Sequence, residues 1–163
     1  MLKYVDTRVC FQEVPDEISL CINLSGCPHR CEGCHSSYLQ DDIGEPLDED
    51  VLDKLIEKNK GVTCICFMGG DNAIPFVLSL GRYVRNKYKL KSAWYSGLVF
   101  SNQNLYNYSE YFDYVKTGPF IKSRGPLTSP TTNQKFYKLT FGHPEKYKDI
   151  TYKFWKNESQ DNK

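Results

Sequence analysis

Three closely spaced cysteines are the part of the sequence that points most directly to chemistry. Cys27, Cys31 and Cys34 fall within the eight residues CPHRCEGC, and the other cysteines stand at positions 10, 21, 64 and 66. Thiolates at this spacing are typical ligands of a metal centre, because a short loop can turn them toward one point. The segment therefore predicts a metal site with three sulfur ligands.

Three kinds of metal centre fit these residues. A structural zinc site needs four ligands, and His29 or His35 could complete one with the three cysteines. An ordinary ferredoxin cluster uses four cysteines, but Cys21 lies up to roughly 20 Å of extended chain from Cys27, so we do not expect it to take part. The third kind is a [4Fe-4S] cluster with three cysteine-bound irons and one iron left to bind another ligand.

The composition indicates one globular domain over residues 1–163. A chain of this length can bury about two-thirds of its unfolded surface. Hydrophobic residues make up 40% and charged residues 25%, near the averages for soluble proteins, and 12 Tyr with 9 Phe make the chain unusually aromatic. Lysine and arginine number 21 against 20 acids, and this net charge of +1 is not the footprint of a nucleic-acid-binding protein.

The N-terminus and the cysteine count indicate the compartment. MLKYVDTRVCFQ has no apolar core of the length a signal peptide needs, and no later stretch approaches the roughly 18 apolar residues of a membrane span. Seven cysteines is an odd number, which argues against a disulfide framework and for reduced thiols. We expect a cytoplasmic protein that contacts neither a membrane nor nucleic acid.

Strand and helix patterns alternate in the first half of the chain. ISLCINL predicts a strand over residues 18–24, and the cysteine loop, 25–36, begins immediately after it. Asp48 can cap a helix whose apolar positions share one face, with Gly61 closing it. The apolar run VTCICFM predicts a strand covered on both faces, and Pro75 is placed for the start of a second helix.

Two further strands are expected in KSAWYSG and FDYVKTG, so the alternation predicts an α/β fold with a mostly parallel sheet. Binding sites in such sheets lie beyond the carboxyl ends of the strands, where the cysteines and the turns GGD, YSG and KTG all fall. The polar stretch at about 121–134 is expected to be a loop over that cleft. Residues from about 138 to 163 are expected to form a C-terminal appendage that frays at SQDNK.

The turns at these strand ends supply the remaining candidate residues. Gly69 and Gly70 allow the backbone to approach a ligand closely, and Asp71 follows them, although a plain tight turn capped by Asp is the alternative. A second turn could line the same pocket, as could residues 116–118, and ordinary strand-to-helix turns explain both about as well. The candidates in the second turn are Tyr95, Ser96 and Gly97.

These motifs together resemble a known family. CPHRCEGC fits the CxxxCxxC motif of the radical S-adenosylmethionine (SAM) superfamily, and the chain from about Val14 to Tyr137 is similar to activating proteins of the anaerobic ribonucleoside-triphosphate reductase, in the branch that activates glycyl radical enzymes. The resemblance rests on GCPHRCEGCHSSYL, FMGGDNAIP, WYSGL, DYVKTGPF and TTNQ, in that order. Many superfamily members carry an aromatic residue before the last cluster cysteine, where this chain has Gly33, and a glycine there is similar to the reductase-activating branch.

The resemblance implies an incomplete α/β barrel and a [4Fe-4S] cluster on Cys27, Cys31 and Cys34, whose open iron binds SAM. It implies that the GGD turn meets the methionyl part of SAM, with Asp71 near the ammonium group. A one-electron donor such as flavodoxin or ferredoxin would reduce the cluster, and SAM would be cleaved to methionine and a 5'-deoxyadenosyl radical. That radical would take a hydrogen atom from a glycine of the reductase large subunit. A homodimer is a further option.

Two other functions stay open: a small radical SAM enzyme that acts on a metabolite, similar to the deazapurine synthases, and a non-enzymatic zinc-binding interaction module. Hydrogen-atom abstraction needs no acid or base, so we expect His29 and His35 to pack or hydrogen-bond around the cluster. We interpret the other four cysteines as buried thiols, because Cys64 and Cys66 share a strand face without meeting disulfide geometry. The aromatic excess is expected to pack in the core or at a protein interface.

Overall fold

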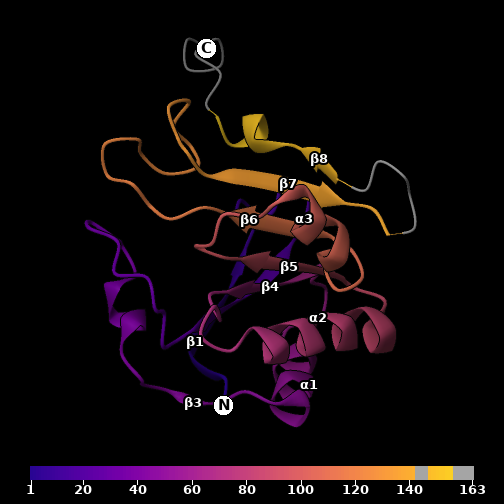
Figure 1. Ribbon diagram of the computed structural model, residues 1–163. Helices are drawn as coiled ribbons and strands as arrows, with labels where there is room; N and C mark the ends of the chain where they lie inside the picture. Colours follow the sequence, from indigo (N-terminus) through magenta and orange to yellow (C-terminus); the bar gives the residue numbers. More distant parts are fainter. Residues whose placement is uncertain (142–146, 156–163) are drawn as a thin grey trace, which may run out of the picture.

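The structure of the chain, a computed structural model, describes residues 1–141 and 147–155. Within these residues eight strands form one sheet, in the order β3-β1-β2-β4-β5-β6-β7-β8 (Figure 1). The strands are β1 Lys3–Cys10, β2 Ser19–Leu24, β3 Glu45–Pro46, β4 Cys64–Met68, β5 Lys91–Tyr95, β6 Tyr114–Thr117, β7 Lys135–Leu139 and β8 Tyr147–Asp149. The helices are α1 Glu49–Lys58, α2 Ile74–Tyr88 and α3 Asn102–Tyr108, with 3₁₀ turns η1 Ser37–Gln40 and η2 Thr151–Phe154. The expected fraying of SQDNK lies outside the described residues.

The centre of the sheet is parallel, as the sequence predicted. Strands β2, β4, β5 and β6 pair in parallel, whereas β1 and β3 at one edge and β7 and β8 at the other pair antiparallel. The chain therefore has a mixed α/β fold. In the described residues the sheet stays open, because its two end strands, β3 and β8, are not neighbours.

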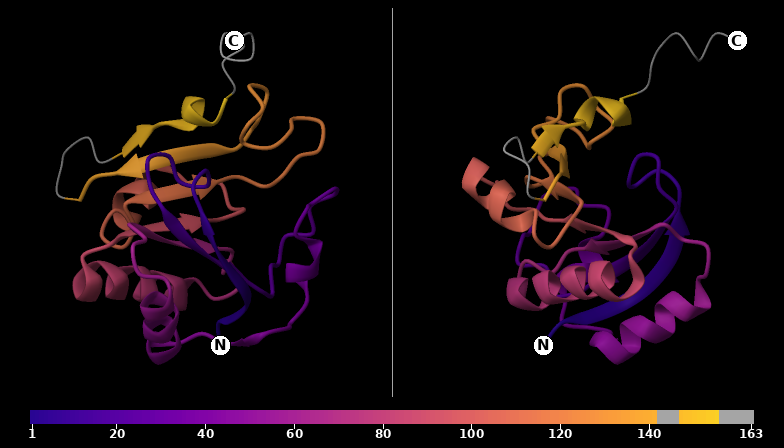
Figure 2. Two further views of the ribbon diagram at one scale, coloured as in Figure 1. Left: turned by 180° about the vertical axis from the view of Figure 1, so that it is seen from behind. Right: turned by 90° about the vertical axis from the view of Figure 1, so that its right-hand side faces the viewer.

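The two longer helices begin where the sequence predicted and pack side by side (Figures 1 and 2). Asp48 caps α1 by accepting a hydrogen bond of 2.9 Å from the Val51 amide. The helix ends at Lys58 with Asn59 as its cap, so the expectation that Gly61 closes it was wrong by two residues. None of the described helices is long and apolar enough to cross a bilayer.

Both faces of the central strands are buried, which explains why VTCICFM shows no polar alternation. On one face the side chains of Ile22, Phe67 and Trp94 pack with the helices. On the other face Cys21, Cys66 and Phe136 pack under two loops, through Val14 of the segment 11–18 and Leu127 of the segment 118–134. This second, loop-covered face is the one that leads to the candidate site. The predicted burial of Cys10, Cys21, Cys64 and Cys66 is confirmed.

Most of the aromatic residues are either buried in the core or partly buried against it. Phe112 and Tyr114 are buried, and Tyr108 packs edge-on against Trp94 at a centroid distance of 5.5 Å. Trp94 also stacks with Phe112 at 5.6 Å. Trp94, Phe112 and Tyr108 support the sheet from the helix side, whereas Tyr114 packs on the loop-covered face.

Candidate metal centre

A cavity of about 520 Å³ lies beyond the carboxyl ends of the parallel strands. The cysteine loop and the loop that precedes β7 extend from this side of the sheet, at the left in Figure 1. A cavity of this volume and position is typical of a ligand site in a fold with a parallel sheet. The sequence-predicted residues on its wall are Cys27, Cys31, Cys34, Gly69, Asp71, Tyr95, Ser96 and Gly97.

The cysteine loop holds its three thiols half-buried and free of disulfides. The amide of Cys27 donates to the Leu39 carbonyl at 2.9 Å, which ties the start of the loop to the turn η1. The Cys27 thiol donates to the His29 carbonyl at 3.6 Å, and burial raises the pKa of this thiol. The loop therefore turns three potential sulfur ligands into the cavity, together with His29 and His35.

The backbone before the last cysteine explains the departure at Gly33. This residue has φ +75°, in the left-handed region that glycine adopts readily and that an aromatic residue rarely adopts. The following amide, that of Cys34, donates to the Cys31 carbonyl at 3.3 Å and closes a tight turn. Gly33 is therefore what allows this loop to place Cys31 and Cys34 on one cavity.

The spacing of the three sulfur atoms bears on the kind of metal centre. Ligands of one tetrahedral zinc ion, with Zn–S bonds near 2.3 Å, lie about 3.8 Å from one another. Within residues 1–141 and 147–155, Cys27, Cys31 and Cys34 do not form a group of three ligand atoms within 4.8 Å of one another, either among themselves or with a histidine. A group that meets this criterion lies elsewhere in the described residues. The spread of the three loop cysteines is wider than one zinc ion requires.

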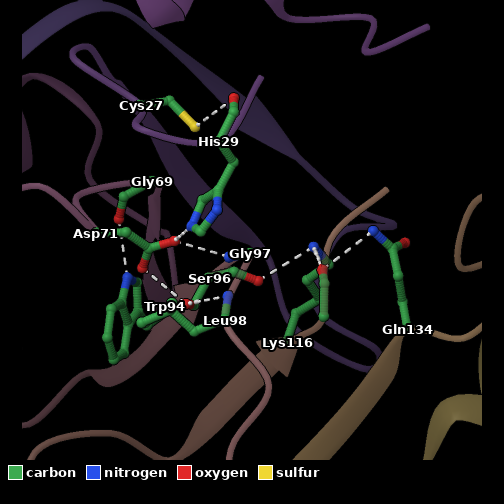
Figure 3. Close-up of polar contacts among 11 residues, drawn as sticks. Cys27, His29, Gly69, Asp71, Trp94, Ser96, Gly97, Leu98, Lys116 and Gln134 are labelled. Carbon is green, nitrogen blue, oxygen red and sulfur yellow. Dashed lines mark hydrogen bonds and ion pairs between the residues drawn. The ribbon is translucent and has the colours of Figure 1, made fainter. Parts of the chain in front are cut away.

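Asp71 is the centre of the polar network in the cavity wall (Figure 3). Its side chain is 3% exposed, and its two oxygens accept hydrogen bonds from His29 Nε2 and Ser96 Oγ at 2.7 Å and from the Gly97 amide at 2.8 Å. The carboxylate thus joins the cysteine loop to the turn after β5. The expectation that His29 hydrogen-bonds near the cluster site agrees with this contact, while a place for Asp71 beside an ammonium group of SAM stays a prediction.

The two glycines before Asp71 have different surroundings. Gly69 lies on the cavity wall, and its carbonyl accepts a hydrogen bond of 2.8 Å from Trp94 Nε1. Gly70 is buried under the turn, where an added Cβ would come within 2.3 Å of Val77. The structure therefore places Gly69 at the cavity and Gly70 against helix α2, where its small size serves packing.

Tyr95 and Ser96 form part of the cavity wall. The Tyr95 hydroxyl donates to the Glu13 carbonyl, which links β5 to the segment 11–18. Ser96 is 1% exposed, and its hydroxyl oxygen also accepts from the Leu98 amide at 3.0 Å. Both residues lie on the cavity, and the expectation that the YSG turn contacts a cofactor stays a prediction.

Lys116 is a cavity residue that the sequence placed nearby without a role. Its ammonium donates to the carbonyls of Gly118 at 2.9 Å and Ser96 at 3.2 Å, and Gln134 shares the Gly118 carbonyl at 3.4 Å (Figure 3). Burial lowers the pKa of Lys116 to about 8. The sequence feature that could have indicated this buried position is that Lys116 lies two residues after Tyr114, on the loop-covered face of β6.

The late Asn-Gln pair holds the loop at the cavity rim. Asn133 Nδ2 donates to the Pro119 carbonyl at 3.0 Å, and Gln134 is buried on the cavity wall. The segment 118–134 contains no helix or strand, and Pro126, Leu127 and Thr128 of this segment line the cavity. Glu13 and Gln12 also line it, and nothing in the local sequence had indicated them.

Comparison with known proteins bears on this site. No match was found among the curated proteins or among the solved structures. A family model described as "4Fe-4S single cluster domain" matches residues 18–136, a stretch that begins beside β2 and includes all three cysteines of the loop. Because this match spans more than half of the chain, the protein belongs to the family of 4Fe-4S single cluster domains.

Proposed function

We propose that the chain is an iron–sulfur enzyme that binds SAM at the open iron of a [4Fe-4S] cluster and generates a glycyl radical on an anaerobic ribonucleoside-triphosphate reductase. The observation that carries the proposal is the meeting of Cys27, Cys31 and Cys34 with the GGD, YSG and KTG strand ends at one cavity, inside the region that matches the 4Fe-4S family.

The donor set suits such a cluster. Cys27, Cys31 and Cys34 would hold it, and no other cysteine lines this cavity in the part of the chain that the structure describes. A cluster distributes its thiolates over separate irons, so it accommodates sulfur atoms farther apart than the ligands of one zinc ion. The match to the 4Fe-4S family over the region that holds these three cysteines therefore favours an iron–sulfur centre over the zinc-binding module.

When bound on Cys27, Cys31 and Cys34, the cluster would supply the one electron needed for reductive cleavage of SAM to methionine and a radical that can abstract a hydrogen atom. The residues of this chain bind and orient. Asp71 fixes His29 and the Gly97 turn in the cavity wall, and Lys116 offers a cation for an anionic group such as a carboxylate. Phe120 and Leu127 add apolar surface that limits water.

The proposed partners follow from the shape of the site. An open sheet, which we interpret as an incomplete barrel, leaves the cavity accessible to a flexible glycine-bearing segment of the reductase large subunit. A flavodoxin or ferredoxin would supply the electron. We place the reaction in the cytoplasm, where thiols stay reduced, and a homodimer would be compatible with it.

The test begins with anaerobic reconstitution of the full chain with iron and sulfide. We expect a brown protein with about four irons per chain, and an electron paramagnetic resonance signal of the reduced cluster that changes when SAM is added. Cys27→Ala should abolish the bound iron and the signal of the reduced cluster. Cys64→Ala removes a buried thiol from the first residue of β4 and should keep both. Reduced protein should then convert SAM to 5'-deoxyadenosine and install a glycyl radical on the reductase.

Three results would contradict the proposal. Zinc without iron, lost in the Cys27→Ala variant, would establish the zinc module. SAM cleavage that depends on a small molecule and not on the reductase would favour the metabolite enzyme. A cluster whose signal is unchanged by SAM would remove the radical mechanism altogether.

A further inference from the structure

A second group of metal-ligating side chains lies away from the cysteine loop. Cys10 at the end of β1, Cys21 on β2 and Glu13 in the segment that joins these strands bring two sulfur atoms and a carboxylate oxygen within 4.8 Å of one another. Cys10 is 7% exposed and Cys21 is 0% exposed, and neither forms a disulfide. Three such ligands at this separation are close to the spacing around a single metal ion.

A third thiol stands beside this group. Cys66 on β4 is the register partner of Cys21 in the parallel pair β2–β4, and it is 0% exposed. Strand pairing thus places a third sulfur beside the group, outside the 4.8 Å separation that the three ligand atoms share.

The charges around the group also suit a divalent cation. Arg8 Nη2 donates to Glu13 Oε1 at 3.1 Å, and Arg8 is the register partner of Cys21 in the pair β1–β2. Thiolates at Cys10 and Cys21 with the Glu13 carboxylate carry three negative charges, which one divalent cation and Arg8 together balance. Such a balance is needed because uncompensated charge is costly in a buried site.

We propose that Cys10, Glu13 and Cys21 form a second, mononuclear metal site that takes a thiophilic divalent cation, with Zn²⁺ as the expected ion. The site is independent of the proposed iron–sulfur chemistry. Zn²⁺ binds sulfur and oxygen ligands in tetrahedral geometry, and an ion held by residues of separate segments stabilises a fold. A disulfide is the less favourable use of these thiols, because burial keeps oxidants from them.

The position of the site gives it a structural task. Gln12 and Glu13 line the cavity, and the Tyr95 hydroxyl donates to the Glu13 carbonyl. Cys21 and Cys66 lie two residues before Asn23 and Met68, which line the same cavity from the same strand faces. A metal ion here would fix the segment 11–18 to β1 and β2 and so hold one wall of the cavity.

The test uses the full chain after anaerobic reconstitution, with Zn²⁺ as the probe. Protein incubated with one equivalent of zinc is passed over a chelating resin, and iron and zinc are counted by mass spectrometry. We expect about one zinc per chain in addition to the iron, a loss of roughly tenfold or more in zinc affinity in Cys10→Ser and Cys21→Ser, and full retention in the matched control Cys64→Ser. Cys27→Ala should lose iron and keep zinc, which separates this site from the cluster.

Cobalt substitution guards against variants that fail to fold. Co²⁺ in the site should give sulfur-to-cobalt absorption, which Glu13→Gln should retain while its zinc affinity falls roughly tenfold or more. Glu13 is half-buried, so this variant should fold. Zinc that is stripped by the resin, zinc affinity unchanged in Cys10→Ser or Glu13→Gln, or a Cys10–Cys21 disulfide seen as a loss of two hydrogens would each overturn the proposal.

Discussion

Replacing Asp71 tests whether one buried carboxylate holds the walls of the cavity together. In Asp71→Ala, Ser96 Oγ and the Gly97 amide lose the acceptor that they contact at 2.7 and 2.8 Å. Ser96 is 1% exposed, so its unsatisfied donor costs about 1–3 kcal/mol, and the half-buried Gly97 amide adds less, which predicts a loss of about 3 kcal/mol in the free energy of unfolding. His29 is left out of this sum, because its side chain is 23% exposed and can turn toward water.

The Asp71→Asn variant should lose less. Its amide keeps one acceptor oxygen but carries no charge, and its nitrogen cannot accept from the remaining donors. Charge-assisted hydrogen bonds are roughly twice as strong as neutral ones, so we expect a loss of about 2 kcal/mol. The order wild type, Asn, Ala is therefore a specific outcome of the geometry around Asp71.

The assay is urea unfolding of the reduced apoprotein, followed by circular dichroism, with iron content after reconstitution as a second readout. Asp53→Asn is the control, because Asp53 accepts from Tyr83 and Lys87 at 2.9 and 2.8 Å but joins α1 to α2 away from the cavity. It should lower stability and leave iron content unchanged. A loss below about 1 kcal/mol in Asp71→Ala, or equal losses in Ala and Asn, would refute the reasoning.

Three further predictions concern the same wall. Gly97→Ala places a Cβ within 2.7 Å of His29 Cδ2, so His29 should leave Asp71, and iron and sulfide content after reconstitution should fall. Burial lowers the pKa of Lys116 to about 8 in the folded protein, whereas the unfolded chain keeps this proton up to about pH 10.4. Because the unfolded state then binds more protons, the free energy of unfolding of the wild-type apoprotein should rise between pH 8 and 10. It should rise less in Lys116→Met, and urea midpoints measured across this pH range would show the difference. Trp94→Phe removes the donor to the Gly69 carbonyl and should cost about 1–3 kcal/mol in urea unfolding.

Each of these predictions has an outcome that contradicts it. Gly61→Ala meets no atom within 4 Å but is strained by the φ of +99° at Gly61, so it is a control for a destabilising Gly→Ala change that does not contact His29. Equal loss of iron in Gly61→Ala and Gly97→Ala would dissociate the effect from His29. An identical pH profile in Lys116→Met would mean that other groups titrate in this range. Unchanged stability in Trp94→Phe would show that the Gly69 carbonyl finds another donor.

Local sequence patterns were sufficient for the central strands and two helices. β2, β4, β5, β6, α1 and α2 each carry a run of apolar residues at strand or helix spacing, or a cap such as Asp48. The antiparallel strands at the edges were not predicted, because an edge strand such as β1 is half-exposed and its pattern is weak. Helix α3 was also missed, because it buries only Leu105 of its seven residues.

The sequence by itself determined the candidate ligands of the cluster, because Cys27, Cys31 and Cys34 lie within one short loop whose spacing is visible in the chain. It also determined that the strand-end turns would face one side, since parallel strands place their carboxyl ends at the same edge. Only the tertiary structure decided that Asp71 binds His29 across 42 positions and that Lys116 is buried beside the cavity.

The same holds for the thiols of Cys10, Cys21 and Cys66, which the sequence could describe only as buried. Their meeting depends on the register of β1 with β2 and of β2 with β4, and a shift of one residue in either pair would turn a sulfur to the opposite face of the sheet. Register is set by the packing of both faces of the sheet, a property of the folded chain that no local segment contains.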